Sequence, residues 1–274
     1  MASSCTWPRL PTPRSACGRL TLDDDRTLSL GAIATRSLPR GDRTRTLRWV
    51  TRQFPDGPPV DEAGALLAVQ HRVARAMSLV TRLEIGPPPE ITPGPVIHAA
   101  NHRSLADLLL AANTFSRWGW PIRPLVAGSY FQRPGIGWLL ERLRCIPVDG
   151  TEALDLATEA LSEGWSVAIM PEGRIVPEAE WAPTGVGRAR SGIGRLAIDT
   201  GLPVVAIGAS GTERFWPRGR SMPQIRPGRR FPLAVSCEVV GVIADEAARD
   251  ATDLIMDAIA RQVVESDRKT GRIT

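Results

Sequence analysis

The sequence of 274 residues has little lysine and little cysteine, and it contains no long apolar run. Lys269 is the only lysine, so nearly all basic groups are arginines, which bind phosphates and carboxylates through paired donors. The four cysteines form no Cys-x-x-Cys pair and no zinc spacing, which argues against a disulfide-dense mini-protein and predicts free thiols. No run of about 18 apolar residues occurs, so we expect no transmembrane helix, and the N-terminus has no signal-peptide core.

The net charge of +5 first suggests a nucleic-acid partner, but its position argues otherwise. Residues 1–60 contain ten arginines and five aspartates, which account for the whole excess, and the remaining residues are neutral in sum. No nucleic-acid recognition motif is present in that neutral part. We therefore expect no nucleic-acid partner and predict a low-order, Pro/Arg-rich tail over 1–60, able to touch anionic lipid, in front of a single domain over 61–274.

Residues 61–84 have apolar side chains at three- and four-residue steps, with arginines on much of the other side. This pattern predicts an amphipathic helix at the start of the domain. Such a helix lies on a membrane surface or packs its apolar side on the domain, and the second arrangement is the commoner one.

Short apolar runs alternate with helical stretches through the rest of the chain. This alternation predicts an α/β fold in one domain, with a mixed, mostly parallel sheet flanked by helices. The expected strands are 95–100, 123–127, 144–148, 166–170, 203–208 and 232–242. The expected helices are 104–116, 134–143, 151–163, 191–200 and 245–266.

The first candidate site is the segment 101–107, Asn-His-Arg-Ser-Leu-Ala-Asp, between an expected strand and an expected helix. On one helix, residues five apart point about 140° apart. His102 and Asp107 therefore meet only if His102 lies in the loop and Asp107 in the first helical turn, with Ser104 as N-cap. The carboxylate would then bind one ring nitrogen and leave the other as a general base. Two alternatives are a simple capping box and a metal site formed with His98.

The second candidate site, residues 169–175, ends another expected strand, where ligands bind in parallel α/β sheets. Gly173 allows close approach of a ligand to the backbone, and Glu172 and Arg174 place both charge signs at one point. Arg174 is suited to hold a phosphate. The alternative is an ordinary turn with an ion pair.

These two segments together resemble the glycerolipid acyltransferase family, which includes the lysophosphatidic acid acyltransferases. Asn-His-x4-Asp follows a strand, and Pro-Glu-Gly-Arg follows about seventy residues later. Two further blocks are similar to the family in order and spacing, so that the resemblance covers roughly residues 61–240. The middle block comprises residues 125–127, 134–137 and 144–148, and the last block comprises 192–197 and 201–205.

The resemblance implies an O-acyltransferase that uses acyl-CoA or acyl carrier protein as donor and a lysophospholipid, above all 1-acylglycerol 3-phosphate, as acceptor. It implies that His102 is the general base and that Asp107 orients it. No metal and no bound cofactor are implied, and the absence of Gly-x-Ser-x-Gly fits a mechanism without an acyl-enzyme. The substrate-binding residues that it implies are Asn101, Arg144, Glu172, Gly173, Arg174 and Pro203.

The chain departs from the family pattern at two places. Gly128 stands where many members have lysine, and Asp149-Gly150-Thr151 stands where many have an arginine expected to contact the acceptor phosphate. Either Arg188, Arg190 or Arg195 replaces that contact, or the acceptor lacks phosphate. A non-catalytic membrane-binding protein of the same fold is a further alternative, which the presence of His102 and Asp107 disfavours. The expected location is the cytoplasm, peripheral on the inner face of the cell membrane.

Overall fold

The computed structural model describes residues 54–273, so that nearly all of the predicted tail lies outside the described residues. Seven strands of the described part form one sheet in the order β1-β7-β6-β2-β5-β3-β4. Neighbouring strands are parallel except for the antiparallel pair β6–β7. This confirms the predicted mixed, mostly parallel sheet. The strands are β1 (Thr81–Ile85), β2 (Ile97–Ala100), β3 (Ile122–Ala127), β4 (Ile146–Val148), β5 (Ser166–Ile169), β6 (Val204–Ser210) and β7 (Phe231–Gly241).

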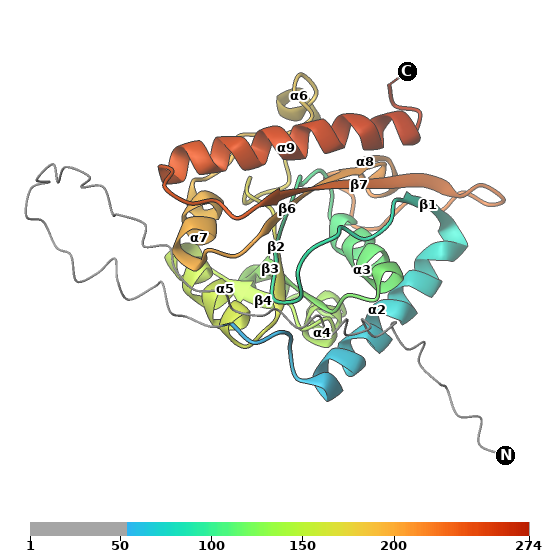
Figure 1. Ribbon diagram of the computed structural model, residues 1–274. Helices are drawn as coiled ribbons and strands as arrows, with labels where there is room; N and C mark the ends of the chain where they lie inside the picture. Colours follow the sequence, from blue (N-terminus) through green and yellow to red (C-terminus); the bar gives the residue numbers. More distant parts are fainter. Residues whose placement is uncertain (1–53, 274) are drawn as a thin grey trace, which may run out of the picture. The chain divides into compact units, whose positions relative to one another are not determined.

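Helices cover both faces of the sheet, and α9 runs along β6 and β7 (Figure 1). No helix in the described part of the chain is long and apolar enough to cross a bilayer. The α-helices are α2 (Val60–Val80), α3 (Asp107–Trp118), α4 (Ile136–Arg142), α5 (Ala153–Ser162), α6 (Glu178–Trp181), α7 (Gly192–Thr200), α8 (Thr212–Phe215) and α9 (Ala248–Lys269). Short 3-10 turns lie at Gly128–Tyr130 and Gly150–Glu152.

The two faces of β2 show how the core divides, because successive strand residues point to opposite sides. Ile97 and Ala99 pack in a cluster with residues of α5, α7 and α9. His98 points to the other face, where its ring lies edge-on to Phe115 of α3 and Trp120, at centroid distances of 4.7 and 5.1 Å. The predicted strand is therefore buried on both sides, as a central parallel strand should be.

The helix α9 lies directly on β6 at Gly208. A Cβ atom at this glycine would lie 2.1 Å from the carbonyl carbon of Gln262. The Ser266 hydroxyl donates a hydrogen bond of 2.8 Å to the Gly208 carbonyl. Only a residue without a side chain allows the helix and strand backbones to approach this closely.

The predicted helix over 61–84 is too long. The helix α2 ends at Val80, and Thr81 begins β1, which pairs with β7 at the edge of the sheet. Leu83 continues the helical spacing in the sequence, but it is the inward residue of an alternating edge strand. Of the two arrangements expected for α2, the structure shows packing on the domain, since Leu66 and Met77 are buried in its core.

Candidate active site

The two candidate segments meet at one edge of the sheet. Because β2, β5 and β6 are parallel neighbours, their carboxyl ends lie at the same edge. The segment 101–107 follows β2 and the segment 170–175 follows β5. A backbone hydrogen bond of 2.9 Å from Val176 N–H to the His102 carbonyl joins them. This is the edge where ligands bind in open α/β sheets.

His102 and Asp107 are in contact. The His102 Nδ1 atom lies 2.9 Å from Asp107 Oδ2. A carboxylate only accepts hydrogen bonds, so Nδ1–H donates and the other ring nitrogen, Nε2, carries the lone pair in the neutral ring. The His102 side chain is 21% exposed, and Nε2 has no hydrogen-bond partner among the described residues. The ring is thus oriented on one side and accessible on the other, which suits a general base.

The buried carboxylate of Asp107 is held by the loop backbone. The Oδ2 atom accepts hydrogen bonds from the N–H groups of Arg103 and Ser104, at 2.8 and 2.9 Å. The prediction of Ser104 as N-cap is wrong, whereas Asp107 does lie in the first helical turn, as expected. The helix begins at Asp107 after Ala106, and Asp107 binds N–H groups that precede it, while the Ser104 hydroxyl accepts from Ala106 N–H.

The side chain of Asn101 is hydrogen-bonded to the backbone of the protein. Its amide donates to the Ala209 carbonyl at 3.1 Å and accepts from the Ala209 N–H at 2.8 Å, which links the end of β2 to β6. The residue is 1% exposed. This contact fixes the chain immediately before His102, and it engages the side chain that was predicted to bind substrate.

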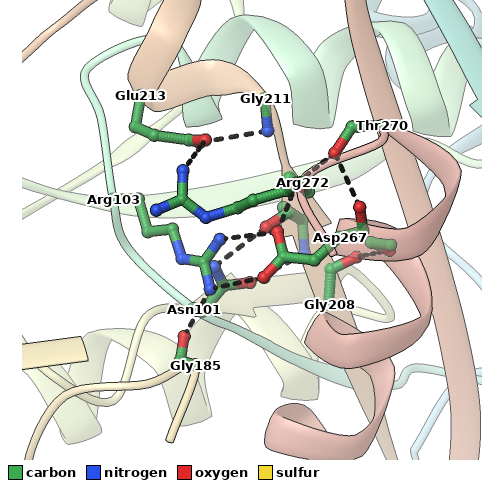
Figure 2. Close-up of polar contacts among 12 residues, drawn as sticks. Asn101, Arg103, Gly185, Gly208, Gly211, Glu213, Asp267, Thr270 and Arg272 are labelled. Carbon is green, nitrogen blue, oxygen red and sulfur yellow. Dashed lines mark hydrogen bonds and ion pairs between the residues drawn. The ribbon is translucent and has the colours of Figure 1, made fainter. Parts of the chain in front are cut away.

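Arg103, which directly follows His102, connects the loop to the C-terminal helix α9 (Figure 2). Its guanidinium is buried and donates to both carboxylate oxygens of Asp267 in α9, at 2.9 and 3.2 Å, and to the Gly185 carbonyl at 2.8 Å. It also lies over the Trp181 ring, 3.8 Å from the centroid. Asp267 accepts a further bond from the Ser210 hydroxyl. No pattern in the sequence indicated this cluster.

Glu172 lies close to His102 and Asp107 and is buried. Burial raises the pKa of this carboxyl to about 7, while a hydrogen bond from Gly187 N–H and the charge of His102 lower it and the charge of Asp107 raises it. The second oxygen, Oε2, is buried without a partner among the described residues. Glu172 is therefore a carboxyl group that gains or loses a proton near neutral pH beside His102.

Two arginines near Glu172 differ in their contacts. Arg174 is half exposed and forms an ion pair with Glu180 of α6. The Arg190 side chain lies against Gly173, and a Cβ atom at this glycine would lie 3.4 Å from the Arg190 Nε atom. Gly173 has a φ of +66°, which glycine adopts without strain. No carboxylate of the described residues pairs with Arg190.

Two predicted substrate-binding residues lie elsewhere. Arg144 forms an ion pair with Glu62 of α2 and lies over the Trp165 ring, so its guanidinium faces the helix layer. Pro203 precedes β6, and its carbonyl accepts a hydrogen bond from Ile97 N–H at the start of β2. Since His102 follows the other end of β2, Pro203 lies at the opposite edge of the sheet. These positions do not fit contact with a substrate bound at His102.

The two departures from the family pattern lie side by side. The Gly128 N–H donates to Asp149 Oδ1 at 3.2 Å. A Cβ atom at residue 128 would lie 2.1 Å from Asp149 Oδ2. A lysine at 128 would therefore displace Asp149. Where the resemblance leads us to expect a cationic group, the chain has the Asp149 carboxylate, which accepts a hydrogen bond from Gly128 N–H.

The metal site considered with His98 does not form. The His98 ring is fully buried between aromatic rings, and burial lowers its pKa to about 3. Among the described residues, no three side chains of the metal-ligating types cluster.

Comparison with known proteins shows what this chain is similar to. A family model described as Acyltransferase matches residues 82–210. Two chloroplastic 1-acyl-sn-glycerol-3-phosphate acyltransferases, BAT2 of Brassica napus and LPAT1 of Arabidopsis thaliana, are each 26% identical over 131 residues, which is 46% of this chain. The match spans only 36% and 34% of those two proteins, about a third of their length.

A solved structure shows the same fold. It is the 1-acyl-sn-glycerophosphate acyltransferase PlsC from Thermotoga maritima, with a TM-score of 0.60 and 21% identity, over 73% of this chain and 78% of that one. The matched family segment contains both candidate segments, His102 to Asp107 and Glu172 to Arg174. The sequence motifs, the family match over residues 82–210 and the shared fold agree, and this part of the chain is similar to the glycerolipid acyltransferases.

Proposed function

We propose that this protein is an O-acyltransferase that transfers a fatty acyl group from acyl-CoA or acyl carrier protein to a lysophospholipid hydroxyl in phospholipid biosynthesis. 1-Acylglycerol 3-phosphate is the acceptor that the two plant relatives act on by name. The observation that carries the proposal is the contact of His102 Nδ1 with Asp107, which leaves Nε2 accessible. No bound cofactor or metal takes part in the proposed reaction.

This geometry supports the following reaction. Nε2 of His102 takes the proton from the acceptor hydroxyl as its oxygen bonds to the thioester carbonyl carbon. The tetrahedral intermediate collapses, the carbon–sulfur bond breaks, and the thiolate receives the proton from the imidazolium. Asp107 stabilises that imidazolium through Nδ1–H, and the two backbone N–H groups at Asp107 keep its carboxylate in place. No covalent acyl-enzyme is needed.

The acceptor phosphate is proposed to bind beside Glu172 and Gly173. Arg174 is available to a phosphate only by exchanging its bond to Glu180. Arg190 lies at Gly173 and has no carboxylate partner in the described chain, so it needs no such exchange. Of the three arginines considered as replacements, we therefore favour Arg190. Arg195 pairs with Asp199 on the surface of α7.

A second candidate function is acyl transfer to an acceptor without phosphate. The contact of Gly128 with Asp149 favours it, because a carboxylate stands where the resemblance expects a cation. A phosphate near Asp149 would be repelled, whereas a hydroxyl group could donate a hydrogen bond to it.

The test is acceptor-dependent thiol release from acyl-CoA and from acyl carrier protein. We expect His102→Ala to lower the rate at least about 100-fold. His71→Ala is the matched control, because His71 is exposed on α2 and bonds only the Leu67 carbonyl. Equal rates for His102→Ala and the unmodified protein would contradict the mechanism.

The same assay separates the two acceptors. Lysophosphatidic acid and a monoacylglycerol with the same acyl chain differ only in phosphate. With a phosphate acceptor, Arg190→Gln should raise KM more than it lowers kcat, since the arginine binds a group remote from the reacting hydroxyl. Faster release with the monoacylglycerol would favour the second candidate function. Localisation on the cytoplasmic face of the membrane remains part of the proposal.

A further inference from the structure

The loop between α8 and β7 carries an unbalanced positive charge. Residues 217–230 contain five arginines and no acidic residue. All five are exposed, and none pairs with a carboxylate among residues 54–273. They are Arg218, Arg220, Arg226, Arg229 and Arg230.

Two large apolar side chains project from the same loop. Met222 and Ile225 are each 70% exposed. The loop is nevertheless held in place, because Gln224 N–H donates to the Phe215 carbonyl at 2.8 Å and Trp216 Nε1–H donates to the Arg220 carbonyl at 2.9 Å. The exposed methionine and isoleucine therefore belong to a fixed surface and have no cover within the described chain.

This loop lies at the edge of the sheet that holds the candidate active site. Together with α8, it connects the carboxyl end of β6 to the start of the antiparallel β7, and β6 is the parallel neighbour of β2. The Ser104 hydroxyl, two residues after His102, donates to the Trp216 carbonyl at 2.7 Å. A surface bound to the loop would thus face the edge from which substrates reach His102.

We propose that residues 217–230 dock this protein on an anionic lipid surface. The arginines bind lipid phosphates, and Met222 and Ile225 enter the boundary between headgroups and acyl chains. The inference deepens the proposed function, since it names the surface that supplies the lipid acceptor. The helix α2 is a poorer anchor, because Leu66 and Met77, on its apolar side, are buried in the domain.

An acidic protein, such as an acyl carrier protein, is the competing occupant. It would pair with the arginines but would gain nothing from bare methionine and isoleucine side chains surrounded by charge. The combination of exposed apolar tips and unpaired arginines matches the layered chemistry of a bilayer surface, with phosphate outside and hydrocarbon beneath.

The experiment is sedimentation of the full chain with vesicles of phosphatidylcholine containing about one third phosphatidylglycerol, compared with phosphatidylcholine alone. The charge variant replaces five loop arginines by glutamine: Arg218, Arg220, Arg226, Arg229 and Arg230. The matched control removes the same charge from the N-terminal segment: Arg36, Arg40, Arg43, Arg45 and Arg48. The apolar variant is Met222→Ser with Ile225→Ser, and its control is Val242→Ser with Leu254→Ser, which are exposed elsewhere.

One arginine near an anionic membrane contributes about fivefold in partitioning. We therefore expect the loop charge variant to bind at least about 100-fold more weakly at low salt, and the effect to shrink as salt rises. The apolar variant should bind the vesicles more weakly at all salt concentrations. Each control variant should bind more tightly than the loop variant to which it is matched. Equal loss in the control and loop charge variants would overturn the inference, and so would loop-dependent binding of acyl carrier protein without vesicle binding.

A water-soluble, short-chain acceptor distinguishes this inference from the proposed function. Loss of vesicle binding with full activity on the soluble acceptor supports the docking role. Loop-dependent vesicle binding without thiol release from any acceptor would refute the enzymatic proposal and leave the docking surface standing. Thiol release together with vesicle binding that does not depend on the loop would refute the docking surface and leave the enzymatic proposal standing.

Discussion

Replacing Asp267 by alanine should destabilise the domain by about 3–5 kcal/mol, because the Arg103 guanidinium would remain buried without its counter-charge. The side chains of Arg103 and Asp267 are 1% and 9% exposed. Two hydrogen bonds to Asp267 would be lost, and Ser210 would lose its carboxylate partner as well. The bond to the Gly185 carbonyl and the Trp181 ring would remain, but neither carries a full negative charge.

The size of this effect depends on burial, which a second ion pair on the same helix tests. Asp253 pairs with Arg249 one turn away on α9, and both side chains are 57% exposed. Asp253→Ala should therefore cost only about 0.3–0.5 kcal/mol. Replacing both members of the buried pair, Arg103→Met with Asp267→Leu, should restore much of the stability, since no unpaired charge stays inside.

Urea unfolding followed by circular dichroism measures all four proteins, the parent included. If Asp267→Ala lost less than about 1 kcal/mol, as Asp253→Ala should, water would be reaching Arg103 and the reasoning from burial would be refuted. Thiol release by the double variant then shows whether the pair also holds His102. Restored stability with a lowered kcat and an unchanged KM would identify Arg103 as a positioning residue.

Three other predictions concern pH and packing. Because burial raises the pKa of Glu172 from 4.5 to about 7, the protonated form is favoured on folding, and stability should fall by on the order of 3 kcal/mol as pH rises from about 4.5 to 7. Unfolding curves of Glu172→Gln across this range should lack that fall. Because burial lowers the pKa of His98 from 6.5 to about 3, stability should fall as pH drops below 6.5, and His98→Leu should remove this acid sensitivity in the same titration. Gly208→Ala should lower the free energy of unfolding by about 3 kcal/mol or more, since its Cβ would clash with the Gln262 backbone. The control Gly64→Ala, in open space on α2, should raise it by about 0.5–1 kcal/mol. A Gly208→Ala protein as stable as the parent would contradict the close packing of α9.

Local sequence signals were sufficient for the strands that end at the site, but the short helices α6 and α8 beside it were not predicted. The strand β6 is a continuous apolar run that is buried along its whole length, and such runs between helical stretches indicate a parallel sheet. The strand β1 was missed because nothing in Thr81–Ile85 breaks the preceding helical pattern. Its pairing with β7 decides the structure there, and Thr81 lies opposite Phe231, too far along the chain for a local pattern to reveal.

The same limit applies to the site. The contact between His102 and Asp107 spans only six residues, so local geometry allowed it to be expected, on the condition that His102 lies in the loop and Asp107 in the first helical turn. The bond between Arg103 and Asp267 joins residues 164 positions apart, and no spacing rule reaches that far. Arg190 could have been selected by its place among the arginines after Glu172, but only the fold shows that its side chain lies at Gly173.

In the segment 101–107, the side chains around His102 are buried and bonded within the domain, whereas His102 itself is accessible. Asn101, Arg103 and Asp107 are 1%, 2% and 4% exposed, and each is bound to a different part of the domain: β6, α9 and the loop backbone. A ligand at this edge can therefore reach the histidine without displacing a buried contact, whereas the flanking side chains would first have to break theirs. A substitution at Asn101 should accordingly act through the orientation of His102 and lower kcat, while Arg190, which is exposed and unpaired with any described carboxylate, should act on KM.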